Sequence, residues 1–302
     1  MKLYRIQTND GPRIAIGYGE LILDAGKIYE QAGEKTPEVI LRGDMRSICA
    51  APDVVVVFLA DVLQNLKTKI GQDHAAVMRP RPEQILAPLP NPAKFICVGL
   101  NYADHCDEQN KPHPPHPVLF SKFNNAIVGP HDNILKTDVT SQMDWEAELG
   151  VVIGLGGRKI SRDDAASHIF GYTAINDVSA RDLQKADGQF FRAKSQDTYA
   201  PMGPCIVTTH EINDPGNLKI SSRVNGIVMQ NSTTANLIFD IPTLIEFISE
   251  GITLEPGDII STGTPAGVGI HRTPPIVLKP GDEVEVEIEG IGVLRNRVTG
   301  ES

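Results

Sequence analysis

Residues 143–154 read MDWEAELGVVIG, and this stretch carries the strongest signals for both fold class and function. The odd-numbered positions of 145–153 are all apolar, whereas Asp144, Glu146 and Glu148 occupy even-numbered positions. Because alternate side chains of a strand point to one face, the pattern predicts a half-buried β-strand with three carboxylates on its other face. Like charges two residues apart on a strand repel each other, so the pattern indicates that something positive lies against them.

Short strands between Gly/Pro-rich turns are predicted for most of the surrounding sequence. Asn225-Gly226 separates two apolar stretches, which predicts a two-residue β-hairpin. Pro-Gly-Asp occurs at 256–258 and again at 280–282, each time before a predicted strand. Long helical segments do not alternate with these strands, which argues against a doubly wound parallel sheet. The sequence predicts an α+β, β-rich fold, rolled or barrel-like, with peripheral helices.

Two domains are predicted, a small N-terminal domain at 1–85 and a larger domain at 86–302. The proline-rich stretch 79–94 has the composition of a linker. Within the first domain, the apolar spacing predicts three strands and one helix, at 2–8, 13–18, 20–23 and 54–66. In the second domain, helices are predicted from Ser161, a serine cap followed by acidic residues, and over 242–250.

The amino-acid composition and net charge exclude some classes of binding partner. The chain has 302 residues, 41% of them hydrophobic, and a formal net charge of −10, which argues against nucleic acid or an anionic membrane as the main partner. No run of about 18 apolar residues predicts a membrane span. The N-terminal segment lacks the apolar core of a secretory signal, and the four cysteines show no CxxC spacing. We therefore expect a cytoplasmic protein with free thiols.

A metal site is one interpretation of the acidic strand. Asp177 follows the apolar run 170–175 and precedes a predicted helix, a position from which an aspartate often points into a cleft. Together with Glu146 and Glu148 it would form an all-oxygen site suited to Mg²⁺, Mn²⁺ or Ca²⁺. The alternative is a solvent-exposed strand edge that carries acidic residues.

Three further segments are candidates for catalysis or substrate binding. His105 and Glu108 are three residues apart, so on a helix the carboxylate can fix the tautomer of the imidazole; the alternative is an exposed polar helix. Lys194 lies in a predicted loop and is either a functional cation or an ordinary surface lysine. The segment STGTPAGVG at 261–269 could hold a carboxylate or oxyanion through its backbone N–H groups.

The chain resembles the fumarylacetoacetate hydrolase family over residues 93–300. The resemblance rests on five motifs in order, NYADHCDEQ, MDWEAELGVVIG, NDVSARDLQ, AKSQDTYAPMGP and STGTPAGVG. It implies a mixed β-roll catalytic domain, a small N-terminal domain and a homodimer. The founding hydrolase has an additional metal-binding aspartate upstream of its catalytic histidine, whereas LNYADH here has no acid before Tyr102. Members that act on smaller substrates share the three-ligand pattern found here.

The resemblance also implies roles for individual residues. It implies that a divalent cation, Mg²⁺ by preference and Mn²⁺ or Ca²⁺ as alternatives, is held by Glu146, Glu148 and Asp177. It implies a catalytic dyad on a lid segment and a catalytic lysine, which are His105, Glu108 and Lys194. The implied substrate-binding positions are Arg181, Gln184 and Thr264.

A 2-oxo acid is the substrate class that these roles imply. We favour hydrolysis of the C–C bond of an acylpyruvate, in which a water activated by His105 and Glu108 attacks the distal carbonyl and an enolate leaves. The same stabilised enolate would serve keto-enol tautomerisation or decarboxylation of oxaloacetate, which is the alternative. A non-enzymatic metal-binding protein is the second alternative. The fold alone does not distinguish these reactions.

Overall fold

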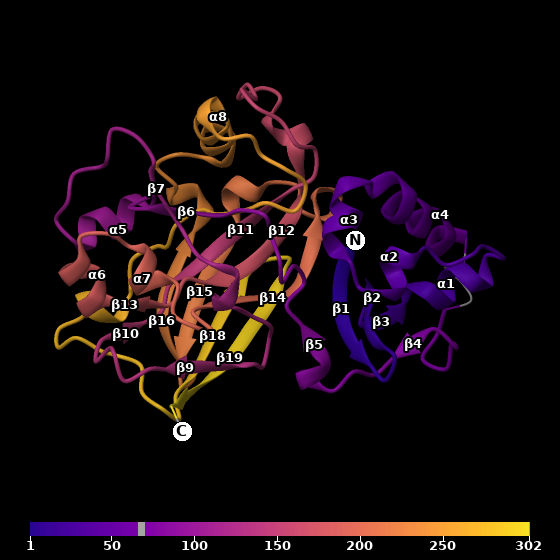
Figure 1. Cartoon of the computed structure of the whole chain (residues 1–302), viewed down its shortest axis with the longest axis horizontal. Helices are drawn as coiled ribbons and strands as arrows, with labels where there is room; N and C mark the ends of the chain where they lie inside the picture. The colour runs from indigo at the N-terminus through magenta and orange to yellow at the C-terminus, as the bar shows by residue number, and fades with distance from the viewer. Residues whose placement is uncertain (66–69, 302) are drawn as a thin grey trace.

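A mixed β-sheet of twelve strands runs through the molecule (Figure 1). The structure is a computed structural model and describes residues 1–65 and 70–301. The strands along the main path of the sheet are, in spatial order, β4 (Val77–Met78), β3 (Leu21–Asp24), β2 (Gly11–Tyr18), β1 (Lys2–Thr8), β14 (Ala200–Thr208), β12 (Ile169–Asn176), β11 (Ala147–Ile153), β17 (Ile259–Ser261), β6 (Phe95–Gly99) and β7 (Val118–Ser121). Two short strands complete it, β5 (Ile85–Leu86) beside β1 and β8 (Ile127–Val128) beside β14.

A second, five-stranded sheet packs against β11, β12 and β14 of the first. Its strands are, in spatial order, β16 (Ile227–Thr233), β15 (Lys219–Val224), β18 (Glu283–Ile288), β19 (Gly292–Gly300) and β9 (Asn133–Lys136). Apolar side chains from both sheets, among them Leu149, Ile220 and Val286, form one buried cluster between them. A short ladder of β10 (Met143–Asp144) and β13 (Ser179–Ala180) lies beside the sheets. The β-rich α+β class predicted from the sequence is confirmed.

The helices are short and lie around the sheets (Figure 1). Four of them accompany the N-terminal strands: α1 (Ala25–Gln31), α2 (Glu38–Leu41), α3 (Met45–Ala50) and α4 (Phe58–Asn65). The other α-helices of the described residues are α5 (Ala103–Glu108), α6 (Arg181–Asp187), α7 (Phe191–Lys194) and α8 (Ile241–Gly251). In the described part of the chain, no helix is long and apolar enough to cross a membrane.

Local sequence signals account for several of these elements. Asn225 and Gly226 form the turn of the predicted hairpin between β15 and β16, with positive φ angles of 51° and 77°. The side chain of Asp240 accepts a hydrogen bond from the N–H of Thr243 at 3.0 Å and so caps the N-terminus of α8. The three predicted N-terminal strands are present as β1, β2 and β3. The helix predicted at 54–66 is present as a π-helical turn over Asp53–Val57 followed by α4; residue 66 lies outside the described residues.

The prediction of a half-buried strand at 143–154 is wrong. The side chains from Met143 to Ile153 are buried on both faces, and the strand is interrupted at Trp145 and Glu146, between β10 and β11. The apolar face packs into the core as expected. The acidic face is buried because basic side chains from other segments cover it, which the periodicity of one strand does not reveal.

Three smaller predictions are also corrected. The expected linker at 79–94 contains β5, in which Leu86 pairs with Arg5 of β1, because prolines flank this strand without interrupting it. The helix expected from Ser161 is only a 3₁₀ turn over Ala165–His168, since β12 begins at the next residue. Lys194 ends the short helix α7 and does not lie in a loop.

The N-terminal segment joins the rest of the molecule through strand pairing. β1 pairs antiparallel with β14, so β1 to β4 continue the main sheet without a break in its hydrogen bonding. In Figure 1 these strands and α1 to α4 lie together on the right-hand side of the view. The division into domains at residues 85 and 86 stays a prediction.

Candidate functional site

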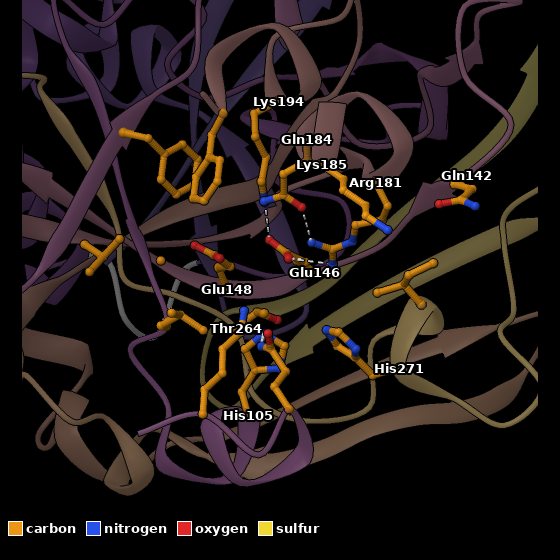
Figure 2. Close-up of a pocket in the computed structure, with 18 residues that line it drawn as sticks. His105, Gln142, Glu146, Glu148, Arg181, Gln184, Lys185, Lys194, Thr264 and His271 are labelled. Carbon is orange, nitrogen blue, oxygen red and sulfur yellow. Dashed lines mark hydrogen bonds and ion pairs between the residues drawn. The ribbon is translucent and has the colours of Figure 1, made fainter. Parts of the chain in front are cut away.

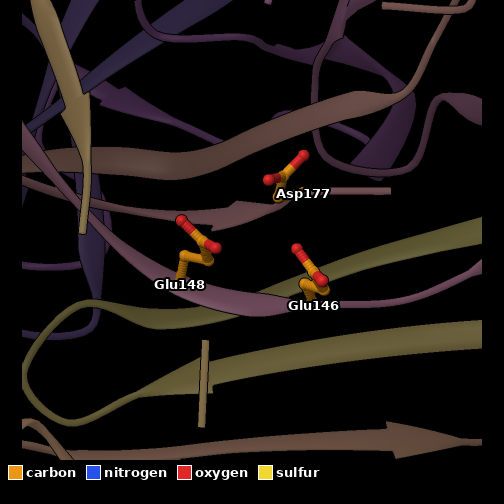
Figure 3. Close-up of side chains that lie close together, drawn as sticks. All are labelled: Glu146, Glu148 and Asp177. Atoms are coloured by element: carbon orange, nitrogen blue, oxygen red, sulfur yellow. The ribbon is translucent and has the colours of Figure 1, made fainter. Parts of the chain in front are cut away.

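Three carboxylates meet where β11 begins and β12 ends (Figure 3). β11 and β12 pair with Ala147 opposite Asn176, so Glu146, just before β11, lies beside Asp177, just after β12. The N–H of Asp177 donates to the carbonyl of Glu146 at 2.9 Å. Glu148 is the second residue of β11, and one oxygen from each of the three carboxylates lies within 4.8 Å of the other two. The antiparallel register therefore gathers two glutamates and one aspartate into a buried cluster.

Basic side chains surround this cluster. The Nζ of Lys194 lies 2.5 Å from Glu146 Oε2 and 2.8 Å from Asp177 Oδ2. A second buried lysine, Lys122 on the segment after β7, lies 2.5 Å from the other oxygen of Asp177. Arg181 Nη2 lies 2.7 Å from Glu146 Oε1. Part of the positive charge that the acidic strand requires therefore comes from the protein itself.

Arg181 is held in place by a carboxylate outside the cluster. Asp144 accepts from Arg181 Nε at 2.9 Å and also from the backbone N–H groups of Gly269 and Ile270 at 2.7 and 3.1 Å. Arg181 Nη1 donates to Gln184 Oε1 at 3.1 Å. Asp144 thus fixes the guanidinium beside the cluster, and Nη2 remains without a well-aligned hydrogen bond. The structure does not place Asp144 among the clustered carboxylates.

The two glutamates have opposite electrostatic environments. Burial and the nearby charges of Asp177 and Glu146 raise the pKa of Glu148 well above its usual value. Burial would also raise the pKa of Glu146, but Arg181 and Lys194 outweigh it and lower that pKa. Burial lowers the pKa of Lys194, whereas Asp177 and Glu146 raise it, with the net result that the pKa rises to about 12. Glu148 is therefore the carboxylate that lacks sufficient positive charge.

The donor set fits a divalent cation. Glu148 accepts hydrogen bonds from the Ser261 hydroxyl at 2.5 Å and the Gly263 N–H at 3.0 Å, but among the described residues it has no ion-pair partner. Among the residues that the structure describes, the four carboxylates of the region, including Asp144, pair with three cationic side chains, those of Lys122, Lys194 and Arg181. Carboxylate oxygens are the preferred ligands of hard cations such as Mg²⁺, Mn²⁺ and Ca²⁺. Glu146, Glu148 and Asp177 could hold such an ion.

An imidazole–carboxylate pair lies across from the cluster on α5. His105 Nδ1 is 3.0 Å from Glu108 Oε2, and the Gly267 N–H donates to Glu108 Oε1 at 2.9 Å. Burial would raise the pKa of Glu108, but the hydrogen bonds from His105 and Gly267 outweigh it and lower the pKa. Because an ionised carboxylate only accepts hydrogen bonds, we assign the proton of the neutral imidazole to Nδ1. Nε2 then carries the lone pair, and the Gln109 side-chain amide donates to it at 2.7 Å.

One cavity of about 480 Å³ connects these groups (Figure 2). Seven of the nine residues predicted from the sequence line it, namely His105, Glu146, Glu148, Arg181, Gln184, Lys194 and Thr264, and Glu108 is bonded to His105. Asp177 lies behind them, within the carboxylate cluster. The Thr264 hydroxyl is held between the carbonyl of Ala147 and the side chain of Gln230 at 2.9 and 2.8 Å. The predicted residues therefore form one site.

Sequence reasoning missed several polar residues of the site, among them Lys111, Gln142 and Lys185, which line the cavity, and three more. Lys122 contacts Asp177, Gln109 contacts His105, and the ring centroid of His271 lies 5.9 Å from that of His105. Gln109 directly follows the dyad residue Glu108, and its position at the helix end was a signal that could have been used. Lys122 and His271 reach the site through tertiary packing, for which the local sequence carries no signal.

Comparison with known proteins adds family information to this geometry. Residues 94–299 match the family described as fumarylacetoacetate (FAA) hydrolase C-terminal. Oxaloacetate tautomerase FAHD2A, mitochondrial, of Bos taurus is 52% identical over 222 residues, which are 72% of this chain and 71% of the relative. Oxaloacetate tautomerase fahd2, mitochondrial, of Xenopus laevis is 42% identical over 300 residues, 99% of this chain and 90% of the relative.

Solved structures share the architecture as well. The fumarylacetoacetate hydrolase EaFAH from the psychrophilic Exiguobacterium antarcticum superposes with a TM-score of 0.81 at 37% sequence identity, over 100% of each chain. The N-terminal segment, which lies outside the matched family region, is thus part of the likeness to both the Xenopus relative and this structure.

Proposed function

This chain belongs to the fumarylacetoacetate hydrolase family, and from that premise we propose that it interconverts the keto and enol forms of oxaloacetate. The observation that carries the proposal is the cavity that joins a His105–Glu108 pair to a carboxylate cluster with Lys194. The sequence alone favoured C–C hydrolysis of an acylpyruvate, with oxaloacetate tautomerisation as the alternative. Similarity to relatives named oxaloacetate tautomerases supports the alternative over that first choice.

Charge stabilisation is the first requirement of the reaction, because removal of a proton from C3 of oxaloacetate leaves negative charge on the C2 oxygen. A divalent cation held by Glu146, Glu148 and Asp177, which we propose to be Mg²⁺ with Mn²⁺ or Ca²⁺ as alternatives, would supply positive charge that stabilises an enolate. Lys194 stays protonated in this environment and lines the cavity, so its ammonium group can donate a hydrogen bond to the same oxygen. Arg181 Nη2, Gln184 and Thr264 are proposed to orient the rest of the substrate.

Proton transfer is the second requirement, and His105 meets it. Its Nδ1–H is committed to Glu108, so Nε2 is the nitrogen that takes the proton from C3. Glu108 stabilises the imidazolium that results. The same proton can then pass to the C2 oxygen to give the enol, and the reverse sequence restores the ketone, so no bond other than C–H and O–H is broken.

Gln109 forms a hydrogen bond with the nitrogen of His105 that is proposed to accept the proton. Its amide donates to His105 Nε2 at 2.7 Å, so the basic nitrogen already has a partner. A substrate that approaches Nε2 has to replace this hydrogen bond. The Gln109 side chain lines the cavity and is free to form a new bond with the bound substrate.

The test is a direct assay of the protein with Mg²⁺. Enol oxaloacetate is mixed with the wild-type protein, and the decay of its ultraviolet absorbance is followed beside a measurement of pyruvate. We expect faster decay of the enol without formation of pyruvate. Production of pyruvate at the same rate would assign the protein to decarboxylation, and no acceleration of either process would contradict the proposal.

C–C hydrolysis of an acylpyruvate is retained as a second candidate. The solved structure named fumarylacetoacetate hydrolase, at 37% identity, favours it. Hydrolysis requires water near His105 in addition to the enolate-stabilising groups that both reactions share. Acetylpyruvate in the same assay distinguishes the two candidates, because its cleavage yields acetate and pyruvate. Membership of an enzyme family leaves no reason to retain the non-enzymatic alternative.

A further inference from the structure

Two exposed lysines, Lys111 and Lys185, belong to the lining of the cavity. The acidic and basic groups at its floor, Glu146, Lys194 and Arg181, are paired with each other. By contrast, the side chains of Lys111 and Lys185 make no hydrogen bond or ion pair within the described residues, although both line the cavity. Unmatched cations at the mouth of a pocket in a chain of net charge −10 indicate that the pocket attracts an anion.

Lys185 is placed by the same helix that carries Arg181. The two residues are four apart on α6, so they lie on one face of the helix and about one turn apart. Because Asp144 and Glu146 fix Arg181 at the floor, Lys185 lies one helical turn away from the carboxylate cluster. Figure 2 shows Lys185 close to Arg181 and on the side of the cavity that faces Gln142.

Two neutral donors share this part of the cavity. The Gln142 side-chain amide has no hydrogen bond within the described part of the chain. The backbone carbonyl of Gln142 accepts from the backbone N–H of Arg181 at 2.9 Å, which places Gln142 beside the start of α6. His271 contacts the ring of His105. Partial burial and the charges of His105 and Arg181 lower the pKa of His271, which favours the neutral imidazole.

We propose that Lys185, with Gln142 and His271, forms a subsite that binds a second carboxylate of the substrate, so that the enzyme selects 2-oxo dicarboxylates over 2-oxo monocarboxylates. The inference rests on the proposed function for the position of the first carboxylate, which faces Lys194 and the carboxylate cluster. Lys185 would form an ion pair with the second carboxylate, and a substrate that ends in a methyl group cannot form this ion pair. Lys111, on the segment that follows α5, also lines the cavity and adds positive potential to it.

Calorimetric titration with matched ligands tests the subsite without turnover. The protein with saturating Mg²⁺ is titrated with malate, with 2-hydroxybutyrate, which has a methyl group in place of the second carboxylate, and with oxalate, which presents only the first end. In Lys185→Met we expect malate to bind about tenfold more weakly. 2-Hydroxybutyrate and oxalate should change by less than about twofold, since the lost interaction is made only with the second carboxylate.

Control variants separate the subsite from a general effect of charge. Lys219→Met removes one exposed lysine from β15, away from the cavity, and should leave the preference for malate unchanged. Lys185→Arg should retain most of that preference, and Lys185→Met combined with Lys111→Met should lose more of it than the single variant.

Two outcomes overturn the subsite: equal weakening of all three ligands in Lys185→Met, or an unchanged preference for malate in the double variant. Failure of the proposed function has a different signature. Wild-type protein would then still prefer malate to 2-hydroxybutyrate through Lys185 but would not accelerate the tautomerisation of oxaloacetate.

Discussion

Among the three clustered carboxylates, Glu148 is the one whose charge most needs a bound cation. Its neighbours Glu146 and Asp177 are paired with Lys194, whereas Glu148 relies on a hydroxyl and a backbone N–H. Amide groups satisfy the hydrogen bonds of such a site about as well as carboxylates do, but they do not attract a divalent ion comparably. Replacing Glu148 by glutamine should therefore weaken metal binding while it preserves the hydrogen bonds that the residue makes in the metal-free protein.

Glu148→Gln is expected to abolish most of the stabilisation that Mg²⁺ confers without lowering the melting temperature of the apo protein. The variant relieves repulsion among three buried carboxylates and leaves the ion pairs of Lys194 intact. Thermal unfolding with and without Mg²⁺ measures both effects, because the stabilisation that a ligand confers at a fixed concentration rises with its affinity. Glu250→Gln, at an exposed position of α8, is the matched control. An undiminished Mg²⁺-induced rise in Glu148→Gln would exclude Glu148 as a ligand.

His105 and Glu108 are expected to act as one unit. If Glu108 contributes by orienting the imidazole and stabilising its charged form, it contributes nothing once the imidazole is gone. The kcat of the double variant His105→Ala/Glu108→Ala should therefore be within about threefold of that of His105→Ala. Steady-state kinetics of the two single variants and the double variant give the comparison. Losses that multiply across the two positions would show that Glu108 has an independent role.

At the scale of the elements, the strands, helices and turns that were predicted correctly are those that a local sequence pattern specifies. Asn225-Gly226, the helical pattern at 242–250 and the Pro-Gly-Asp sequence before β18 are short-range patterns, and each led to the correct element. The same reasoning failed for the acidic strand, because burial of its polar face depends on Lys122, Lys194 and Arg181, which come from other segments.

Sequence motifs identified most residues of the candidate site, but they did not predict how these residues are arranged in space. Spacing brought His105 and Glu108 together on one helix, and the structure agrees because both residues lie on α5. The antiparallel register of β11 and β12, which sets Glu146 beside Asp177, could not be read from either segment alone. Gln142, Lys185 and His271 carry no motif, so their position in the cavity follows only from the fold.

The hairpin between β15 and β16 gives an element-scale prediction. Gly226 has a φ of 77°, and a Cβ added there would meet no atom within 4 Å, so the cost of Gly226→Ala is conformational only. We expect it to destabilise the protein by about 1 kcal/mol. Gly251→Ala at the end of α8, where φ is not positive and the space is also open, should be neutral or slightly stabilising. Chemical denaturation measures both, and equal effects would contradict the account of the turn.

The whole molecule is expected to be a homodimer, as the resemblance to its family implied. The monomer has a mass of 32.8 kDa, so size-exclusion chromatography with light scattering should give about twice that mass. Exposed apolar residues on β16, Ile227 at 64% and Val228 at 51% exposure, are suited to a contact between copies. A mass of one chain at micromolar concentration would contradict this expectation.

The main sheet and the short helices beside it together supply the reactive groups of the site. The main sheet supplies Glu148 and positions Glu146 and Asp177, while the short helices α5, α6 and α7 supply His105, Arg181 and Lys194. The proton carrier and the carboxylate cluster thus belong to different layers of the fold. The central claim is that His105 moves the proton while the cluster and Lys194 stabilise the charge, and the two functions can be separated by one substitution.

The rate of enol-to-keto conversion of oxaloacetate by His105→Ala, at saturating Mg²⁺, tests that claim most directly. We predict a kcat about 10²–10⁴ lower than that of the wild-type protein, the usual contribution of a general acid or base. Oxalate affinity, measured on the same preparation by calorimetry, should change by less than about twofold. His210→Ala, which removes an exposed imidazole away from the cavity, is the matched control and should keep the wild-type kcat. A His105→Ala variant that converts the enol at the wild-type rate would contradict the account.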